Sequence, residues 1–225
     1  MEFTYYGHSC FKILLNGKHI LFDPFISGNE LAKHIDISTI KADYILLSHG
    51  HSDHTLDAIS IAKANDATIV ASYEIAVWAG NQGTKYHPMN TGGRWDFDFG
   101  SVKCVHAVHS SVLPDGTYGG NPMGFIISSN HESFYYSGDT ALTMDMQLIP
   151  KFKKLKFAIL SIGDNFTMGI EDSIEAAKMI ECNTVIGVHY DTFGYIKIDR
   201  QAAIDRFIEA GITLHLPAIG ETIEI

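Results

Sequence analysis

The fold is decided by residues 44–54, which read Tyr44-Ile45-Leu46-Leu47-Ser48-His49-Gly50-His51-Ser52-Asp53-His54. A short apolar run of this kind is typical of a fully buried strand. Four side chains of the metal-ligand type follow it within six positions. Imidazole and carboxylate are donors that borderline divalent metals prefer, and strand ends are where layered α/β proteins place their sites. The spacing therefore predicts a metal site rather than a solvated polar loop.

Three further residues of the same type follow apolar runs elsewhere in the chain. His109 follows residues 105–108, Asp139 comes shortly after residues 134–136, and His189 follows residues 185–188. Each alone would be an ordinary polar residue, but together with the first cluster they supply seven donors. Seven are too many for one tetrahedral site and suit two neighbouring ones. We expect two divalent ions, zinc first, with manganese, iron, nickel or cobalt as alternatives.

The remaining sequence alternates short strands with helices. Strands are expected at residues 3–6, 10–15, 19–22, 68–71, 124–129, 133–136, 157–160 and 184–188, with a run of strands over 85–106 and two short strands at the C-terminus. Asn16-Gly17 predicts a hairpin, and a second hairpin is expected around Asn130. Helices are expected at residues 56–65, 73–79, 144–151, 172–180 and 199–210, the last capped by Asp199 and closed by Gly211. This mixture predicts two sheets packed face to face with helices outside.

The composition indicates one compact domain over residues 1–225, because 46% of the residues are hydrophobic and 19% are charged. Within it we expect two related halves, roughly 1–110 and 111–225. The formal net charge of -10 repels phosphate backbones, and no run of Lys or Arg offsets it. We therefore expect a small-molecule substrate and no nucleic acid as partner. The sequence is also compatible with a homo-oligomer.

Cysteine usage and hydropathy bear on the cellular compartment. Cys10, Cys104 and Cys182 have no paired spacing, which argues against a disulfide framework. The first residues lack the basic start and apolar segment of a signal peptide. No apolar run approaches the roughly 20 residues that span a bilayer. We expect a cytoplasmic protein that does not enter a membrane.

The ligand pattern resembles the metallo-β-lactamase superfamily over nearly the whole chain. The resemblance implies a four-layer αββα sandwich with the metals at one edge between the two sheets. It also implies a ligand set: His49, His51 and His109 for the first metal, Asp53, His54 and His189 for the second, and Asp139 bridging both.

Four other stretches carry a narrower resemblance: residues 7–11, Asp23-Pro24-Phe25, residues 163–169 and residues 189–193. They look like the small bacterial and archaeal branch of metal-dependent hydrolases. That branch is similar to ascorbate-6-phosphate lactonases and, more distantly, to phospholipase-D-type members with a Gly-His element near the N-terminus. The resemblance does not supply a substrate.

Five residues near the expected site have predicted supporting roles. The resemblance implies that Asp23 orients a metal-bound histidine, although an aspartate before proline is also a common turn residue. His8 is expected at the rim of the site, in contact with substrate or as an acid, or else in an ordinary surface turn. Asn165 and Thr167 could donate hydrogen bonds to an oxyanion or phosphate. Tyr190 directly follows a ligand, so its hydroxyl is a candidate substrate contact.

The expected activity is hydrolysis of an ester, lactone or phosphodiester bond of a small metabolite. A hydroxide bridging the two metals would attack, and Asp53 would orient it while binding the second metal. One alternative is a nuclease or phosphodiesterase acting on nucleic acid, which usually needs a basic arm or surface. Another is a non-catalytic metal-binding module, which would normally have lost a ligand. Redox members usually replace histidines in the first cluster, whereas His51 and His54 are intact here.

Overall fold

The computed structural model describes residues 1–129 and 132–225, which form two mixed sheets of seven strands each. The first sheet contains, in spatial order, β14 (Thr222–Glu224), β1 (Glu2–Gly7), β2 (Cys10–Leu15), β3 (Lys18–Phe22), β4 (Tyr44–Leu46), β5 (Thr68–Ser72) and β6 (Lys85–Met89). The second contains β7 (Arg94–Phe97), β8 (Gly100–His106), β9 (Met123–Ser128), β10 (Ser133–Tyr136), β11 (Phe157–Ser161), β12 (Thr184–Val188) and β13 (Thr213–His215).

The two sheets share one pattern of strand directions. Read from β14 and from β7, each sheet has three antiparallel pairings followed by three parallel ones. The strands therefore correspond one to one: β1 with β8, β3 with β10, β4 with β11 and β5 with β12. The chain passes from the first sheet to the second between Met89 and Arg94 and returns to the first with β14. The two halves expected at residues 1–110 and 111–225 stay a prediction.

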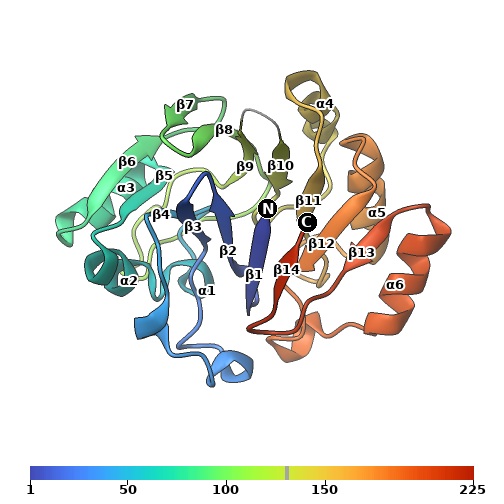
Figure 1. The fold of residues 1–225 in the computed structure, drawn as a ribbon, viewed down its shortest axis with the longest axis horizontal. Helices are drawn as coiled ribbons and strands as arrows, with labels where there is room; N and C mark the ends of the chain where they lie inside the picture. Colours follow the sequence, from blue (N-terminus) through green and yellow to red (C-terminus); the bar gives the residue numbers. More distant parts are fainter. Residues whose placement is uncertain (130–131) are drawn as a thin grey trace.

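Helices cover the outer face of each sheet (Figure 1). On the first sheet these are α2 (Ala58–Asn65) and α3 (Tyr73–Asn81), and on the second α5 (Ile170–Met179) and α6 (Arg200–Glu209). The shorter elements are α1 (Ser52–Thr55), α4 (Ile149–Phe152), η1 (Glu30–Ala32), η2 (Ile37–Thr39), η3 (Met144–Leu148) and η4 (Gly194–Ile196). The two chain ends meet between the sheets, where the Met1 amino group donates to Ile225 O.

Alternating side chains along the central strands divide the core into three clusters. Phe22 of β3 and Ile159 of β11 point into the cluster between the sheets. Leu21 packs in the cluster beneath α2 and α3, whereas Leu160 packs in the cluster beneath α5 and α6. Successive residues of a strand face opposite sides, so three apolar clusters separate four layers. The expected αββα sandwich is confirmed.

Most expected elements form within a few residues of their predicted bounds, and two predictions need correction. The strand before His109 ends at His106, so His109 lies in a loop. The helix expected over residues 144–151 divides into η3 and α4, because Pro150 has no N–H to continue the helical ladder. The strands of the second hairpin pair as expected, but Asn130 lies outside the described residues.

Several local predictions are confirmed. Asn16 and Gly17 both have positive φ in the first hairpin, Asp199 caps α6 by accepting from Ala202 N, and Gly211 has φ of 74°. All three cysteines are buried and free. Within residues 1–129 and 132–225, no helix is long and apolar enough to cross a membrane.

Candidate metal centre

The candidate ligands gather where the carboxyl ends of β4, β10 and β12 meet the loop after β8. His49 and His51 lie in the loop after β4, while α1 carries Asp53 and His54. On the second sheet, His189 follows β12 directly and Asp139 follows β10 after a short turn. That turn needs Gly138, because its φ is 59° and a Cβ there would lie 2.8 Å from Ser48 Cβ. Close approach of the two sheets thus brings together donors that are far apart in sequence.

His49, His51 and His109 form one donor cluster. Each offers a ring nitrogen, and these atoms all lie within 4.8 Å of one another. His49 Nε2 is 3.0 Å from His51 Nδ1, and His51 Nε2 is 3.2 Å from Ser110 Oγ. Three imidazoles at this separation match a three-histidine metal site.

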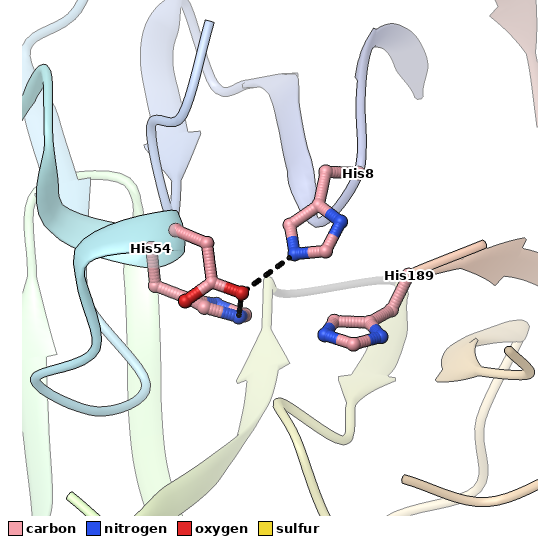
Figure 2. A group of neighbouring side chains, drawn as sticks. His8, His54 and His189 are labelled. Carbon is pink, nitrogen blue, oxygen red and sulfur yellow. Dashed lines mark hydrogen bonds and ion pairs between the residues drawn. The ribbon is translucent and has the colours of Figure 1, made fainter. Parts of the chain in front are cut away.

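Asp53, His54 and His189 form a second cluster, to which the structure adds His8. Figure 2 shows the rings of His8, His54 and His189 converging on one region. His8 Nε2 lies 3.1 Å from Asp53 Oδ2, and His54 Nε2 lies 3.9 Å from the same oxygen. Asp53 is the most exposed of these side chains, at 26%, so its carboxylate faces the solvent side of the centre.

Asp139 lies between the two clusters. Its Oδ2 is 2.9 Å from His189 Nε2 and 3.2 Å from His54 Nε2. The same oxygen is 3.8 Å from His109 Nε2 and 4.0 Å from His49 Nε2. Among the described residues, Asp139 Oδ1 and His54 Nε2 are buried without a hydrogen-bond partner. Since buried polar atoms are rarely left unpaired, this donor set fits a bound metal.

Asp23 fixes the tautomer of one histidine in each cluster, His54 directly and His49 through Ser48. It accepts hydrogen bonds from Ser48 N at 2.8 Å, Ser48 Oγ at 2.5 Å, His54 Nδ1 at 2.9 Å and Tyr136 Oη at 2.6 Å. Because the Ser48 hydroxyl donates to Asp23, it must accept from His49 Nδ1, 2.9 Å away. Both His49 and His54 therefore carry the proton on Nδ1 and direct the Nε2 lone pair toward the centre. That Asp23 orients a metal-bound histidine stays a prediction.

His8 lies beneath the second cluster, not at an open rim, and is 1% exposed. Its ring packs against that of His189, with centroids 4.2 Å apart. Burial, then the neighbouring His189, lower the pKa of His8 to about 4, so its ring is neutral. With Nε2–H donating to the Asp53 carboxylate, Nδ1 accepts from Thr192 Oγ1 at 3.0 Å. The ring thereby fixes the position of Asp53.

The electrostatics of the site differ between the two clusters. Burial would lower the pKa of His54, but the carboxylates of Asp139 and Asp23 hold it well above its usual range. Burial is the main cause that lowers the pKa of His49, His51 and His109. Burial would raise the pKa of Asp139, but its histidine neighbours hold it well below its usual range. Neutral imidazole and ionised carboxylate are the forms that bind metals.

The backbone is strained at three of these positions. His8, Asp23 and His189 have φ of 54°, 39° and 59°, a left-handed region that non-glycine residues seldom occupy. His189 N donates to His8 O at 2.8 Å, which ties two of these positions together across the sheets. Such strain often gathers at functional sites.

A cavity of about 930 Å³ opens over the centre. Its lining includes five candidate site residues and an aromatic group: His51, Asp53, His109, Asp139 and His189, with Phe25, Phe166, Phe193 and Tyr195. Ser52, Ser110, Thr192 and Gly194 complete the lining. A small molecule can therefore reach the donors from this side.

Asn165, Thr167 and Tyr190 do not line this cavity. Asn165 is exposed, and the Thr167 hydroxyl donates to Met168 O at 3.3 Å. Tyr190 is buried on the other side of the chain, where its ring stacks on Tyr5. The contact with substrate predicted for these three residues stays a prediction.

Sequence reasoning missed Ser48, Tyr136 and Phe166. Ser48 opens the ligand stretch, so its place in the motif was a usable signal. Tyr136 lies in an apolar strand and reads as a core aromatic. Phe166 stands between the two polar residues chosen instead, and it lines the cavity that they do not.

Comparison with known proteins places the chain in a family. Residues 18–190 match the Beta-lactamase superfamily domain. A UPF0173 metal-dependent hydrolase of Flavobacterium johnsoniae is 55% identical over 225 residues, covering 100% of both chains. Its counterpart in Christiangramia forsetii is 54% identical over 226 residues, again covering 100% of both.

Two solved structures share the fold of this chain. Igni18, a novel metallo hydrolase from the archaeon Ignicoccus hospitalis, has a TM-score of 0.90 at 32% identity and covers 99% of this chain and 97% of its own. An isothiocyanate hydrolase from Delia radicum gut bacteria shares the fold, with a TM-score of 0.79 at 20% identity over 100% of this chain and 99% of its own. The chain therefore belongs to the UPF0173 metal-dependent hydrolases of the beta-lactamase superfamily.

Proposed function

We propose that this protein is a dinuclear hydrolase that cleaves an ester, lactone or phosphodiester bond of a small molecule. The observation that carries the proposal is the position of Asp139. One of its oxygens lies within 4.0 Å of histidines from both donor clusters, and the other is buried with no hydrogen-bond partner in the described part of the chain. A carboxylate in this position bridges two cations more readily than it completes a single tetrahedral site.

In this proposal the ligands are those that the sequence indicated. His49, His51 and His109 hold one ion, Asp53, His54 and His189 the other, and Asp139 both. Zinc suits the set best, with manganese, iron, nickel or cobalt as alternatives. Two such ions supply Lewis acidity, which makes a water molecule nucleophilic near neutral pH and polarises the bond to be cut.

The chain's own residues position the reactants. Asp53 faces the cavity with an ionised carboxylate, because the hydrogen bond from His8 and the nearby His54 outweigh the effect of burial on its pKa. It can accept a hydrogen bond from an attacking water and hold its direction of approach. Ser110 and Thr192 offer hydroxyls at the wall of the cavity. The name of the Ignicoccus relative, a metallo hydrolase at 32% identity, supports this class of activity.

The experiment is elemental analysis of protein purified without chelator, paired with turnover on a panel of esters, lactones and phosphodiesters. We expect about two metal ions per wild-type chain. The variant Asp139→Ala is expected to hold one or none and to lose turnover, because it removes the ligand shared by both ions. Asp96→Ala, an exposed aspartate on β7, serves as the control and should match wild type in both measurements.

Two results would contradict the proposal. One is a single metal ion, or none, in wild-type protein after reconstitution. The other is metal-replete protein without metal-dependent turnover on any of the three bond classes, which would favour a metal-binding module.

A further inference from the structure

Four aromatic side chains surround the outer part of the cavity: Phe25, Phe166, Phe193 and Tyr195, here called the aromatic rim. Phe166 is 50% exposed and Tyr195 78%, and their rings meet edge to face with centroids 6.2 Å apart. Large exposed apolar side chains beside a cavity usually mark a binding surface. The rim therefore needs an explanation beyond metal binding.

The segment carrying Phe166 is fixed by its backbone. Asp164 and Asn165 both lie in the left-handed region, with φ of 62° and 55°. Asp164 N donates to Met168 O at 3.0 Å, and Met168 N donates to Thr140 O at 3.1 Å, beside Asp139. Phe166 is thereby held at the mouth of the cavity before any ligand arrives.

The segment carrying Tyr195 is tied to the metal centre in a similar way. Asp191 N donates to Ile196 O at 2.8 Å, which closes the loop that follows His189. The loop packs so closely on the neighbouring one that a Cβ at Gly163 would lie 2.1 Å from His189 O. The backbone segments that carry both rim aromatics are thus preorganised, which reduces the entropy lost when a ligand binds.

The charge of the cavity complements these rings. Among the described residues that line it, none is Lys or Arg, and the ionisable groups all belong to the metal centre. The remaining polar groups are the hydroxyls of Ser52, Ser110, Thr192 and Tyr195. An anionic group of the substrate far from the reacting bond would lose hydration here without a cation to pair with, which is costly.

We propose that the substrate carries an uncharged, ring-bearing group that packs against Phe166 and Tyr195 while its ester or lactone carbonyl lies at the metal centre. The substrate class is an aryl-substituted or aralkyl ester or lactone, not a phosphorylated metabolite. This inference rests on the proposed hydrolase function. Stacking and edge-to-face contacts with the rim favour a ring over a chain of equal size.

The test compares two esters with the same leaving alcohol on metal-loaded protein: methyl 3-phenylpropanoate and methyl 3-(phosphonooxy)propanoate. Wild type should prefer the phenyl ester in kcat/KM. Phe166→Ala and Tyr195→Ala should each lower kcat/KM for the phenyl ester about tenfold, and change that for the phosphate ester by less than about twofold. Tyr73→Ala, at an exposed tyrosine of α3 that does not line the cavity, should change neither. Equal or higher turnover of the phosphate ester, or rim variants that behave like Tyr73→Ala, would overturn the inference.

A binding measurement separates this inference from the proposed function. Calorimetric titration of metal-loaded protein with 3-phenylpropanoate and with propanoate requires no turnover. The titration decides about the rim whether or not either ester is hydrolysed, whereas the hydrolase proposal fails only if no ester, lactone or phosphodiester of the panel is turned over. Phenylpropanoate binding that weakens about tenfold in Phe166→Ala and Tyr195→Ala would support the rim as a ring-binding surface. Equal binding of phenylpropanoate and propanoate, or binding unchanged in both variants, would reject it.

Discussion

The two sheets place the same residue types at corresponding strand ends and give them different surroundings. Asp23 follows β3, and Asp139 follows the corresponding strand β10. Both carboxylates are buried. Asp23 accepts four hydrogen bonds, whereas Asp139 faces histidine nitrogens and has an oxygen for which residues 1–129 and 132–225 supply no partner. Burial is thus common to both positions, and hydrogen-bond saturation distinguishes the supporting carboxylate from the candidate ligand.

The same contrast holds at β1 and β8. His8 follows β1, and both of its ring nitrogens have partners, Asp53 and Thr192. His109 follows β8 in a loop and offers a nitrogen to the cluster of His49 and His51. The loops after β4 and β11 differ further, since the first carries ligands and the second carries Phe166. One topology therefore supplies donors, supports and a binding rim from corresponding places.

The histidine pair gives the sharpest test of this contrast. His109→Ala should reduce the metal content from about two ions to about one and abolish turnover, because it removes one of three donors to the first ion. His8→Ala should keep about two ions and lower turnover about 10- to 100-fold, as loss of an outer hydrogen-bond partner does. Elemental analysis and kinetics on both variants, with thermal unfolding to check the fold, measure this. An equal loss of metal in His8→Ala would make His8 a ligand and remove the distinction.

Substitution of Asp23, the supporting carboxylate, should reduce metal binding less than substitution of the candidate ligand His109. In Asp23→Asn one of the two acceptor oxygens becomes an N–H donor, so the four donors can no longer all be accepted and the hold on the Nδ1 proton of His54 weakens. Metal affinity should fall about 10- to 100-fold, and the free energy of unfolding of the metal-free protein by about 3 kcal/mol. Competition with a chelating indicator and urea denaturation measure the two quantities.

A second buried carboxylate provides the control. Asp57 accepts from Ile26 N and from Ser27 N and Oγ, with no histidine among these partners. Asp57→Asn should destabilise the fold by a similar amount and leave metal affinity unchanged. If both variants bound metal equally well, the orienting role of Asp23 would be disproved.

The sequence predicted the donors because their signal is local. A histidine or aspartate at the end of an apolar run needs only the run to be recognised, as at His189 after β12. The partner of Tyr136 could not be predicted, since Asp23 lies 113 positions away and their contact depends on how the sheets pack. The change of sheet between Met89 and Arg94 could not be predicted either, because it depends on non-local strand pairing.

The loop after β11 shows a different limit. Polar side chains made Asn165 and Thr167 the expected contacts, yet Phe166 between them lines the cavity. Two successive left-handed residues, Asp164 and Asn165, turn the chain so that the aromatic ring faces the centre. Asparagine and aspartate adopt left-handed φ more often than most other residues, but they do not require it. The sequence therefore could not establish this turn.

The smallest expected effect belongs to neighbouring tyrosines of β10 that face opposite sides of the second sheet. Tyr136 points between the sheets and donates to Asp23, whereas Tyr135 points toward the outer helices and its buried hydroxyl has no partner among the described residues. Tyr136→Phe should lower the free energy of unfolding by about 1.5 kcal/mol, because it removes a hydrogen bond to a charged acceptor. Tyr135→Phe should be neutral or stabilising, because it removes an unsatisfied hydroxyl.

Urea denaturation of both variants, with metal content measured alongside, tests this pair. Asp23 keeps three of its four donors in Tyr136→Phe, so His49 and His54 retain their tautomers and about two ions should stay bound. Equal destabilisation by the two substitutions would mean that the hydrogen bond from Tyr136 to Asp23 makes no specific contribution to the free energy of unfolding. Loss of metal in Tyr136→Phe alone would show that the second sheet, through one hydroxyl, fixes the carboxylate on which both donor clusters depend.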